Sequence, residues 1–278
     1  MRSDYEVSEF PNFISGSIID TSIKFKMNNE NREIDLYSQS NGIVKVNQKK
    51  IYNINMYNVI YITVVHNNFE VKENQIVGKI FQIPAKIEKK LLESIISNID
   101  APLISIKPYI KQRVSIVAVG EDLYGFKKED GYNEKLSKKL SHYGGNIIYK
   151  EINEENPDKI VNSIKRASAC SDTIFVIYSK TTDPQIIDKS IKLLKVAEVL
   201  PVFIFPGNQT KFFYLEDKAV LILDEDVLHF KISAINIIFS RLACGEKLNF
   251  EEMAKYSYGG ICFLCPICVY PVCPLGKY

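Results

Sequence analysis

The stretch from Arg113 to Pro184 constrains the fold more than any other part of the chain, because strand and helix patterns alternate within it. It begins with the apolar, β-branched run 114–119, which ends abruptly at Gly120, and it closes with a second apolar run, 173–178. Short apolar runs of this kind are typical of strands buried on both faces of a parallel sheet. The alternation predicts an α/β fold in which two strands end in polar loops.

Two helices are expected between these strands. The first covers 132–143 and stops at 144–145, a pair of glycines, which readily adopt the left-handed conformation that ends a helix. The second begins at Asn156-Pro157, an N-cap followed by proline in the first turn. With a short strand between them the order is βαβαβ, and right-handed crossovers bring the carboxyl ends of the strands to one edge of the sheet. A ligand site is expected at that edge.

The polar loop after the last of these strands carries candidate phosphate-binding groups. Asp183 is expected to cap the next helix, whose positive dipole end favours an anion. Lys180, Thr181 and Thr182 precede it and add a cation and two hydroxyls. The four residues are therefore candidate ligand-binding residues. The alternative is a surface helix that Asp183 merely caps.

Length and composition narrow the function classes. A chain of 278 residues suffices for two domains with at least one buried core. A formal net charge of +2 gives no field that favours nucleic acid or an anionic membrane. No stretch approaches the ~18 consecutive apolar residues of a membrane span, and the first residues lack the apolar core of a signal peptide. We expect a cytoplasmic protein that binds neither nucleic acid nor membrane.

The pattern divides the chain into a small β-rich domain, a helix with a linker, an α/β domain and a cysteine-rich tail, at 1–84, 85–111, 112–250 and 251–278. In the first part, Asn41-Gly42 is the strongest hairpin signal, and oligomerisation or covering a neighbouring site is the expected role. In the third part, further strands are expected at 199–205 and 219–223 and a long helix at 227–243.

The tail contains four of the six cysteines in a C-x2-C-x2-C-x4-C spacing with a proline after the last: Cys262, Cys265, Cys268 and Cys273. Thiolates this close in sequence can converge on one zinc ion or one iron–sulfur cluster, and the spacing does not choose between them. Disulfides are disfavoured in a cytoplasmic protein, and unligated thiols are the remaining alternative. Cys170 and Cys244 stand alone and are expected to be small buried residues.

Short motifs along nearly the whole chain, taken in their order, are similar to those of one family. They are 41–46, 51–55, 66–68, 83–84, 119–124, Asp130, 156–157, 183–184, 206–207, 229–231 and the cysteine-rich ending 258–277. In this order the chain resembles the molybdopterin-binding proteins of anaerobic bacteria, which are related to the molybdopterin adenylyltransferases and molybdenumtransferases of molybdenum-cofactor biosynthesis.

The resemblance implies a three-layer α/β/α domain with a mostly parallel sheet that holds the phosphate and pterin of molybdopterin at its carboxyl edge. It implies cofactor-binding roles for Gly120 and Glu121 in the loop after the first strand. Asp122 and Asp130 are the candidate catalytic residues, which would bring a metal ion such as magnesium, or a nucleotide, to the dithiolene and phosphate. Thr181 and Asp183 would lie in the facing loop, and the four cysteines would form the family's cysteine-rich ending. Partners among molybdoenzymes or cofactor-synthesis proteins are also implied, and a homo-oligomer is left open.

Two departures from the family's pattern bear on activity. Tyr178-Ser179 stand where the family has paired glycines, whose bare backbone a phosphate approaches closely. Asp224-Glu225 stand where a Leu-Pro-Gly turn is expected, and a carboxylate within ~4 Å of a phosphate costs on the order of 4 kcal/mol at an effective dielectric of about 20. We therefore expect a molybdopterin-binding protein of cofactor synthesis or sensing, with transferase activity left open. The alternative is a divergent, non-catalytic paralogue that senses redox state or metal through its four-cysteine tail.

Overall fold

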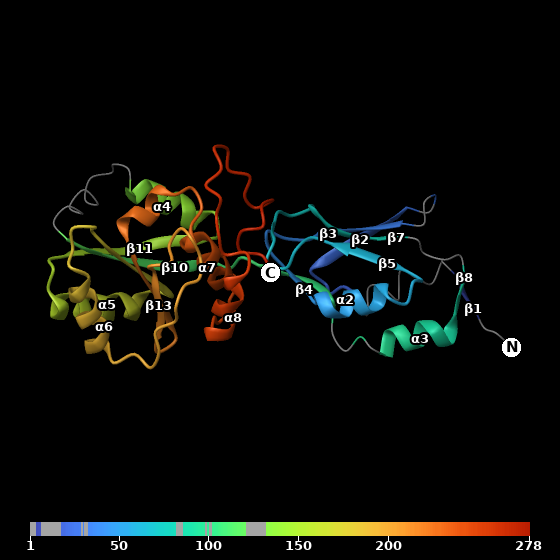
Figure 1. Cartoon of the computed structure of the whole chain (residues 1–278), viewed down its shortest axis with the longest axis horizontal. Coiled ribbons are helices and arrows are strands. Elements are labelled where there is room, and N and C mark those ends of the chain that lie inside the picture. Colours follow the sequence, from blue (N-terminus) through green and yellow to red (C-terminus); the bar gives the residue numbers. More distant parts are fainter. Residues whose placement is uncertain are drawn as a thin grey trace. The chain divides into compact units, whose positions relative to one another are not determined.

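The computed structural model describes residues 4–6, 18–28, 30, 33–81, 86–97, 99, 102–120 and 132–278 (Figure 1). Two compact units make up the chain. The first comprises 1–108 together with Lys277 and Tyr278, and the second comprises 109–276. The chain therefore passes from the first unit to the second after Pro108 and returns to the first after Gly276. The four-part division expected from the sequence stays a prediction.

The first unit is rich in β structure, as predicted. Its sheets are antiparallel, with strand orders β2-β3-β7-β5, β6-β4-β9 and β1-β8. The strands are β1 Asp4–Glu6, β2 Ile23–Asn28, β3 Glu33–Ser38, β4 Gly42–Val46, β5 Tyr61–Val64, β6 Glu70–Val71, β7 Ile76–Phe81, β8 Lys86–Glu88 and β9 Ile104–Pro108, and the helices are α2 Gln48–Asn55 and α3 Lys89–Ser97. One apolar core joins strands of the two larger sheets with α2 and α3.

The hairpin predicted at Asn41-Gly42 is wrong in its pairing. The strand before this turn, β3, pairs with β2 and β7, whereas the strand after it, β4, pairs with β6 and β9. The turn thus carries the chain from one sheet to another. Turn-forming residues report the reversal of the chain, whereas long-range pairing decides which strands become neighbours. Helix α2 was not predicted, since only Ile51 and Ile54 of its eight residues are buried.

The second unit is built on one five-stranded, mostly parallel sheet, which confirms the predicted fold class. Its order is β11-β10-β12-β14-β13, and only β13 is antiparallel to its neighbour. The strands are β10 Gln112–Val119, β11 Gly145–Asn153, β12 Thr173–Tyr178, β13 Lys211–Leu215 and β14 Lys218–Asp224. The helices are α4 Tyr132–Ser141, α5 Pro157–Cys170, α6 Pro184–Leu194, α7 Ala234–Ala243 and α8 Phe250–Ala254, with the short 3-10 helices η3 Glu225–His229 and η4 Lys255–Ser257.

Helices cover both faces of this sheet. Successive side chains of a strand point to opposite faces, so apolar residues on both faces need a covering layer. Val117 and Val119 face a core shared with α5 and α6. On the opposite face Phe175 of β12 meets Phe239 of α7, with ring centroids 5.7 Å apart, and Phe239 meets Tyr143, just after α4, at 6.1 Å. Figure 1 shows α5 and α6 below the sheet and α4 above it. The result is the predicted three-layer α/β/α arrangement.

The predicted helix boundaries next to the sheet edge are confirmed. The side chain of Asn156 accepts hydrogen bonds from the backbone N–H groups of Asp158 and Lys159 at 3.0 and 3.1 Å. The side chain of Asp183 accepts one from Gln185 at 2.9 Å. These caps satisfy amides that have no partner within their own helix, and they fix where α5 and α6 leave the edge.

Two predicted elements beyond β12 are wrong. Residues 199–205 form no strand, and this segment carries only isolated bridges, Leu200 to Phe212 and Phe205 to Ile261. Pro201 and the proline after Phe205 provide no N–H for a ladder, and the hairpin partner of β14 is β13 instead. The helix expected at 227–243 is also interrupted, because η3 ends at His229 and α7 begins only at Ala234. At this start the Oδ1 of Asn236 accepts from the N–H of Ser233 at 3.1 Å. No helix in the described residues is long and apolar enough to cross a membrane.

Candidate ligand site at the carboxyl edge of the sheet

The carboxyl ends of the four parallel strands lie in one row. Val119 at the end of β10 is in register with Asn153 of β11 and Tyr178 of β12, and Tyr178 is in register with Asp224 of β14. The residues that follow these positions therefore leave the sheet together. Such an edge is where parallel α/β sheets bind ligands.

Gly120 lies at the end of β10, and its position admits no other residue without strain. Its φ is +114°, and a Cβ built on it would lie 3.0 Å from both Ser179 Cβ and Thr182 Oγ1. Its N–H donates to the backbone oxygen of Asn153 at 3.0 Å. The backbone at the end of β10 is thus packed closely against the loop after β12. Glu121, Asp122 and Asp130, which the resemblance placed beside it, lie outside the described residues.

The loop from β12 to α6 turns tightly on Ser179. Ser179 is fully buried, its oxygen accepts from the N–H of Thr182 at 2.9 Å, and its hydroxyl lies 3.0 Å from that of Thr181. Of the four candidate residues, Lys180, Thr181 and Asp183 are exposed, whereas Thr182 is only 3% exposed. The hydroxyl of Thr182 lies 3.5 Å from the backbone oxygen of Val119, inside the fold. The structure thus leaves three candidates open to a ligand and gives Thr182 a structural place.

Glu225, which follows the neighbouring strand β14, contacts this loop. Its side chain is buried, and its Oε1 accepts from Ser179 Oγ at 3.3 Å and from the backbone N–H of Lys180 at 3.2 Å. The preceding residue, Asp224, caps η3 by accepting from Val227 N–H at 3.2 Å. Burial raises the pKa of Asp224 above its usual value, and the N–H of Val227 opposes this shift.

Asn153 is an edge residue that the sequence did not single out. It is 7% exposed, and its Oδ1 accepts from Ser163 Oγ at 2.9 Å. Its amide nitrogen has no hydrogen-bond partner in the part of the chain that the structure describes. A buried amide donor is costly to leave unpaired. Asn153 is the last residue of β11, a strand that also carries Lys150 and Glu151, so its polarity gave no distinct sequence signal.

The cysteine tail forms a second candidate site. All four predicted cysteines line a single, mostly apolar cavity of about 220 Å³, which is closed on another side by the segment 229–232. None of the six cysteines forms a disulfide. Within the described ranges no three His, Cys, Asp or Glu side chains converge closely enough to hold a metal ion. Metal binding at the tail therefore stays a prediction. Cys170 and Cys244, which were expected to be buried, are half-buried.

The cysteine loop is tied at its base. The N–H of Gly276 donates to the oxygen of Gly259 at 2.8 Å, and both glycines have positive φ, +76° and +78°. The start of the loop is held by Phe205, which donates to the oxygen of Gly260 at 2.8 Å and accepts from the N–H of Cys262 at 2.9 Å. The segment that carries the four thiols is thus a closed loop.

Lys139 of α4 holds the opposite wall of the cavity. Its ammonium donates to the backbone oxygens of Phe230 and Lys231 at 2.6 and 2.7 Å, and to Asn236 Oδ1 at 3.3 Å. Burial lowers the pKa of Lys139 to about 8, and the neighbouring Cys268 acts in the opposite direction. The cavity thus lies between a thiol-bearing loop and a wall that the half-buried Lys139 holds.

No protein-family model matches the chain, and no curated protein matches it in sequence. Among solved structures, it is similar to the tungsten cofactor synthesizing protein MoaB from Pyrococcus furiosus, with 15% identity over 48% of this chain and 92% of that chain and a TM-score of 0.36. It is also similar to the molybdopterin biosynthesis protein MoeA from Pyrococcus horikoshii, with 12% identity over 87% of this chain and 73% of that chain and a TM-score of 0.33. A third is the protein CinA of unknown function from Thermoplasma acidophilum, with 14% identity over 41% of this chain and 89% of that chain and a TM-score of 0.34. Similarities of this extent assign no function.

Proposed function

We propose that the α/β unit binds molybdopterin, or a closely related phosphorylated pterin, at the carboxyl edge of its sheet, as a binding protein of molybdenum-cofactor synthesis or sensing. One observation carries this proposal. The bare backbone of Gly120 lies against the β12–α6 loop at the end of a row of parallel strands, where the order of motifs resembles that of the molybdopterin-binding family. Localisation in the cytoplasm and partners among cofactor-synthesis proteins belong to the same proposal.

Three exposed groups would contact the ligand. The hydroxyl of Thr181 and the ammonium of Lys180 suit a phosphate, and the first turn of α6 after Asp183 adds the positive end of a helix dipole. Asp122 and Asp130 are proposed to hold a magnesium ion, which would neutralise phosphate charge. Binding is favoured over turnover, because Asp224 and Glu225 place two carboxylates at the same edge.

Binding is tested with the full chain purified without oxygen and titrated with molybdopterin, followed by the change in pterin absorbance. We expect saturable binding by the wild type. Thr181→Val removes an exposed hydroxyl at the edge and should weaken binding about tenfold, which corresponds to about 1.4 kcal/mol. Thr63→Val, an exposed threonine of β5 in the first unit, is the matched control. A folded wild type that takes up no molybdopterin would rule the proposal out.

We propose a second function for the tail, binding of zinc or an iron–sulfur cluster for metal or redox sensing. The specific support is that Cys262, Cys265, Cys268 and Cys273 all line one cavity. Thiolates are preferred ligands of both groups, so the donor set fits either. A bound cluster would supply one-electron redox chemistry, whereas zinc would supply structural stability. The residues themselves would hold the group and shield it within an apolar pocket.

Metal analysis and an anaerobic absorption spectrum test this second proposal. Iron with sulfide and a broad visible absorption would indicate a cluster, and zinc without such absorption would indicate a zinc site. Cys265→Ser should lower the bound metal, whereas Cys170→Ser, a half-buried cysteine outside the cavity, should not. Protein that holds neither metal, even after reconstitution without oxygen, would contradict the proposal.

A further inference from the structure

We propose that Glu225 is an internal anion that occupies the anion-binding groups of the β12–α6 loop and thereby excludes phosphate from the inner part of the edge. This inference rests on the proposed function for the identity of the natural ligand. Inorganic phosphate alone tests it. The group that determines which part of a ligand can approach this loop is then a side chain from η3.

The donors of the loop are of the kind that bind oxyanions. A backbone N–H and a hydroxyl that converge in a tight turn before a helix are the usual means by which a protein holds a phosphate oxygen. Here the N–H of Lys180 and the hydroxyl of Ser179 converge on the same carboxylate oxygen, at 3.2 and 3.3 Å. The carboxylate of Glu225 therefore takes the place of an oxyanion ligand.

Glu225 is held in this place by its own segment. Asp224 caps η3 through Val227, and the side chains of Val227 and Leu228 are 3% and 1% exposed. The backbone on both sides of Glu225 is thus anchored in the fold. Glu225 itself is 8% exposed, so its negative charge acts in a weakly screened environment.

The negative charge of Glu225 determines which ligand groups can bind beside this side chain. A phosphate within hydrogen-bond reach of the Lys180 N–H would also lie beside the Glu225 carboxylate, and like charges at such a distance repel each other. Lys180 is exposed, so its side chain can meet a phosphate that stays in solvent outside the loop. The part of a ligand that lies nearest Glu225 must therefore be neutral or carry hydrogen-bond donors, as the amino and N–H edge of a pterin ring does.

Backbone NMR of the labelled full chain, titrated with inorganic phosphate at constant ionic strength, tests this inference. In the wild type the amide resonance of Lys180 should not respond to phosphate. In Glu225→Ala the same resonance should move and saturate, at a phosphate concentration at least tenfold below the highest one that leaves the wild type unchanged. Asp226→Ala, an exposed neighbour with the same change in net charge, should behave like the wild type.

Glu225→Gln provides a second variant, because it keeps the shape of the side chain while removing its charge. It should also gain phosphate affinity at Lys180, and it serves as the test if Glu225→Ala does not retain the wild-type spectrum. The inference is overturned if wild type and Glu225 variants bind phosphate equally at Lys180, or if a folded variant gains nothing. Loss of the pterin proposal would appear separately, as a wild type that binds no molybdopterin.

Discussion

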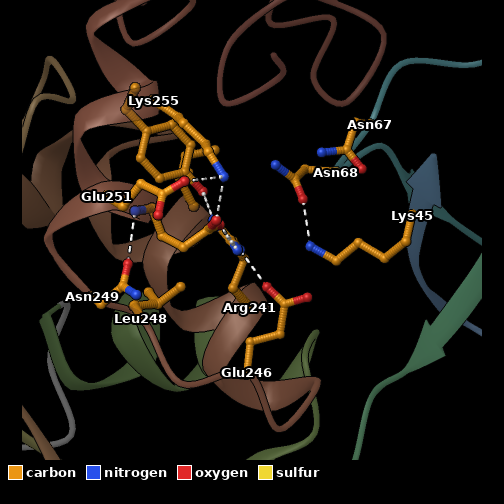
Figure 2. A network of polar contacts seen from close by, with 12 residues as sticks. Lys45, Asn67, Asn68, Arg241, Glu246, Leu248, Asn249, Glu251 and Lys255 are labelled. Atoms are coloured by element: carbon orange, nitrogen blue, oxygen red, sulfur yellow. Dashed lines mark hydrogen bonds and ion pairs between the residues drawn. The ribbon is translucent and has the colours of Figure 1, made fainter. Parts of the chain in front are cut away.

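The guanidinium of Arg241 and the carboxylate of Glu246 form an ion pair whose side chains are only 4% and 6% exposed. The same guanidinium pairs with Glu252 and donates to the hydroxyl of Tyr256 at 3.2 Å. Figure 2 shows Arg241 with Glu246 and, close to them, Lys255. Lys255, whose side chain is 40% exposed, pairs with Glu252. The network links α7 to α8 and η4, the segment that leads into the cysteine tail.

Arg241→Met should lower the free energy of unfolding by about 3–5 kcal/mol, because it leaves two carboxylates, one of them almost fully buried, without their cation. Urea unfolding measures the change. Lys255→Met removes a half-exposed cation from the same network and should cost less than about 1 kcal/mol. Equal losses for the two variants would show that burial does not determine the strength of this network.

Asp172→Asn should destabilise the protein at neutral pH and have no effect in strong acid. Hydrogen bonds from the side chain and backbone of Arg113 hold the pKa of Asp172 below its usual value of 3.8. A carboxyl group with a lowered pKa stabilises the fold above its unfolded pKa, and this contribution is lost as pH falls through the folded value. The difference between wild type and variant should therefore shrink below about pH 3.8 in urea unfolding. Asp217→Asn, on the exposed surface beside Lys218, is the control.

Gly120→Ala should cost about 3 kcal/mol, because a side chain at φ +114° is strained and its Cβ would press on the β12–α6 loop. Gly245→Ala isolates the backbone term, since Gly245 also has positive φ, +72°, but a Cβ there would meet its nearest neighbour at 3.8 Å. That variant should cost about 1 kcal/mol. Thermal unfolding of both variants checks the difference, and similar midpoints would contradict the close packing at Gly120.

Lys139→Met should lower the free energy of unfolding by about 2 kcal/mol, because the backbone oxygens of Phe230 and Lys231 lose their charged hydrogen-bond donor. Amide hydrogen exchange in 229–233 should become faster, since these hydrogen bonds hold that wall of the cavity. The neighbouring Lys138→Met removes an exposed lysine paired with Glu134 and should leave the exchange unchanged. Unchanged exchange in both variants would mean that the wall is held by other contacts.

Local sequence signals predicted most of the α/β unit. The apolar runs at β10 and β12 are strands buried on both faces, and such runs are recognisable in the sequence alone. Asn156 and Asp183 mark helix starts because their side chains accept hydrogen bonds from first-turn amides. The strand expected at 199–205 failed for the opposite reason. Leu200, Val202 and Ile204 are buried, but the place beside β14 is taken by β13, which a local pattern cannot reveal.

In the candidate site, too, local signals were predicted correctly and long-range contacts were not. Gly120 and the β12–α6 loop were predicted, because strand order brings them to one edge. The contact between Glu225 and Lys180 was not, since it joins residues 45 positions apart and depends on the register of β14 against β12. The four cysteines line one cavity, but their convergence on a metal ion, which the spacing predicts, stays a prediction. Lys139, which donates to the backbone of the opposite wall, carried no sequence signal. The roles of Asp122 and Asp130 stay predictions.

The hydrogen bond between Gly276 and Gly259 closes the segment that carries the four thiols and thereby limits how far they can separate. Closing a loop costs conformational entropy that grows with its length, and the folded protein has already met this cost at the base of the cysteine loop. Once one thiol meets a metal ion or an oxidant, the reaction of the remaining thiols is intramolecular. For the metal binding proposed above, opening the base of the loop should therefore weaken binding without removing a single sulfur.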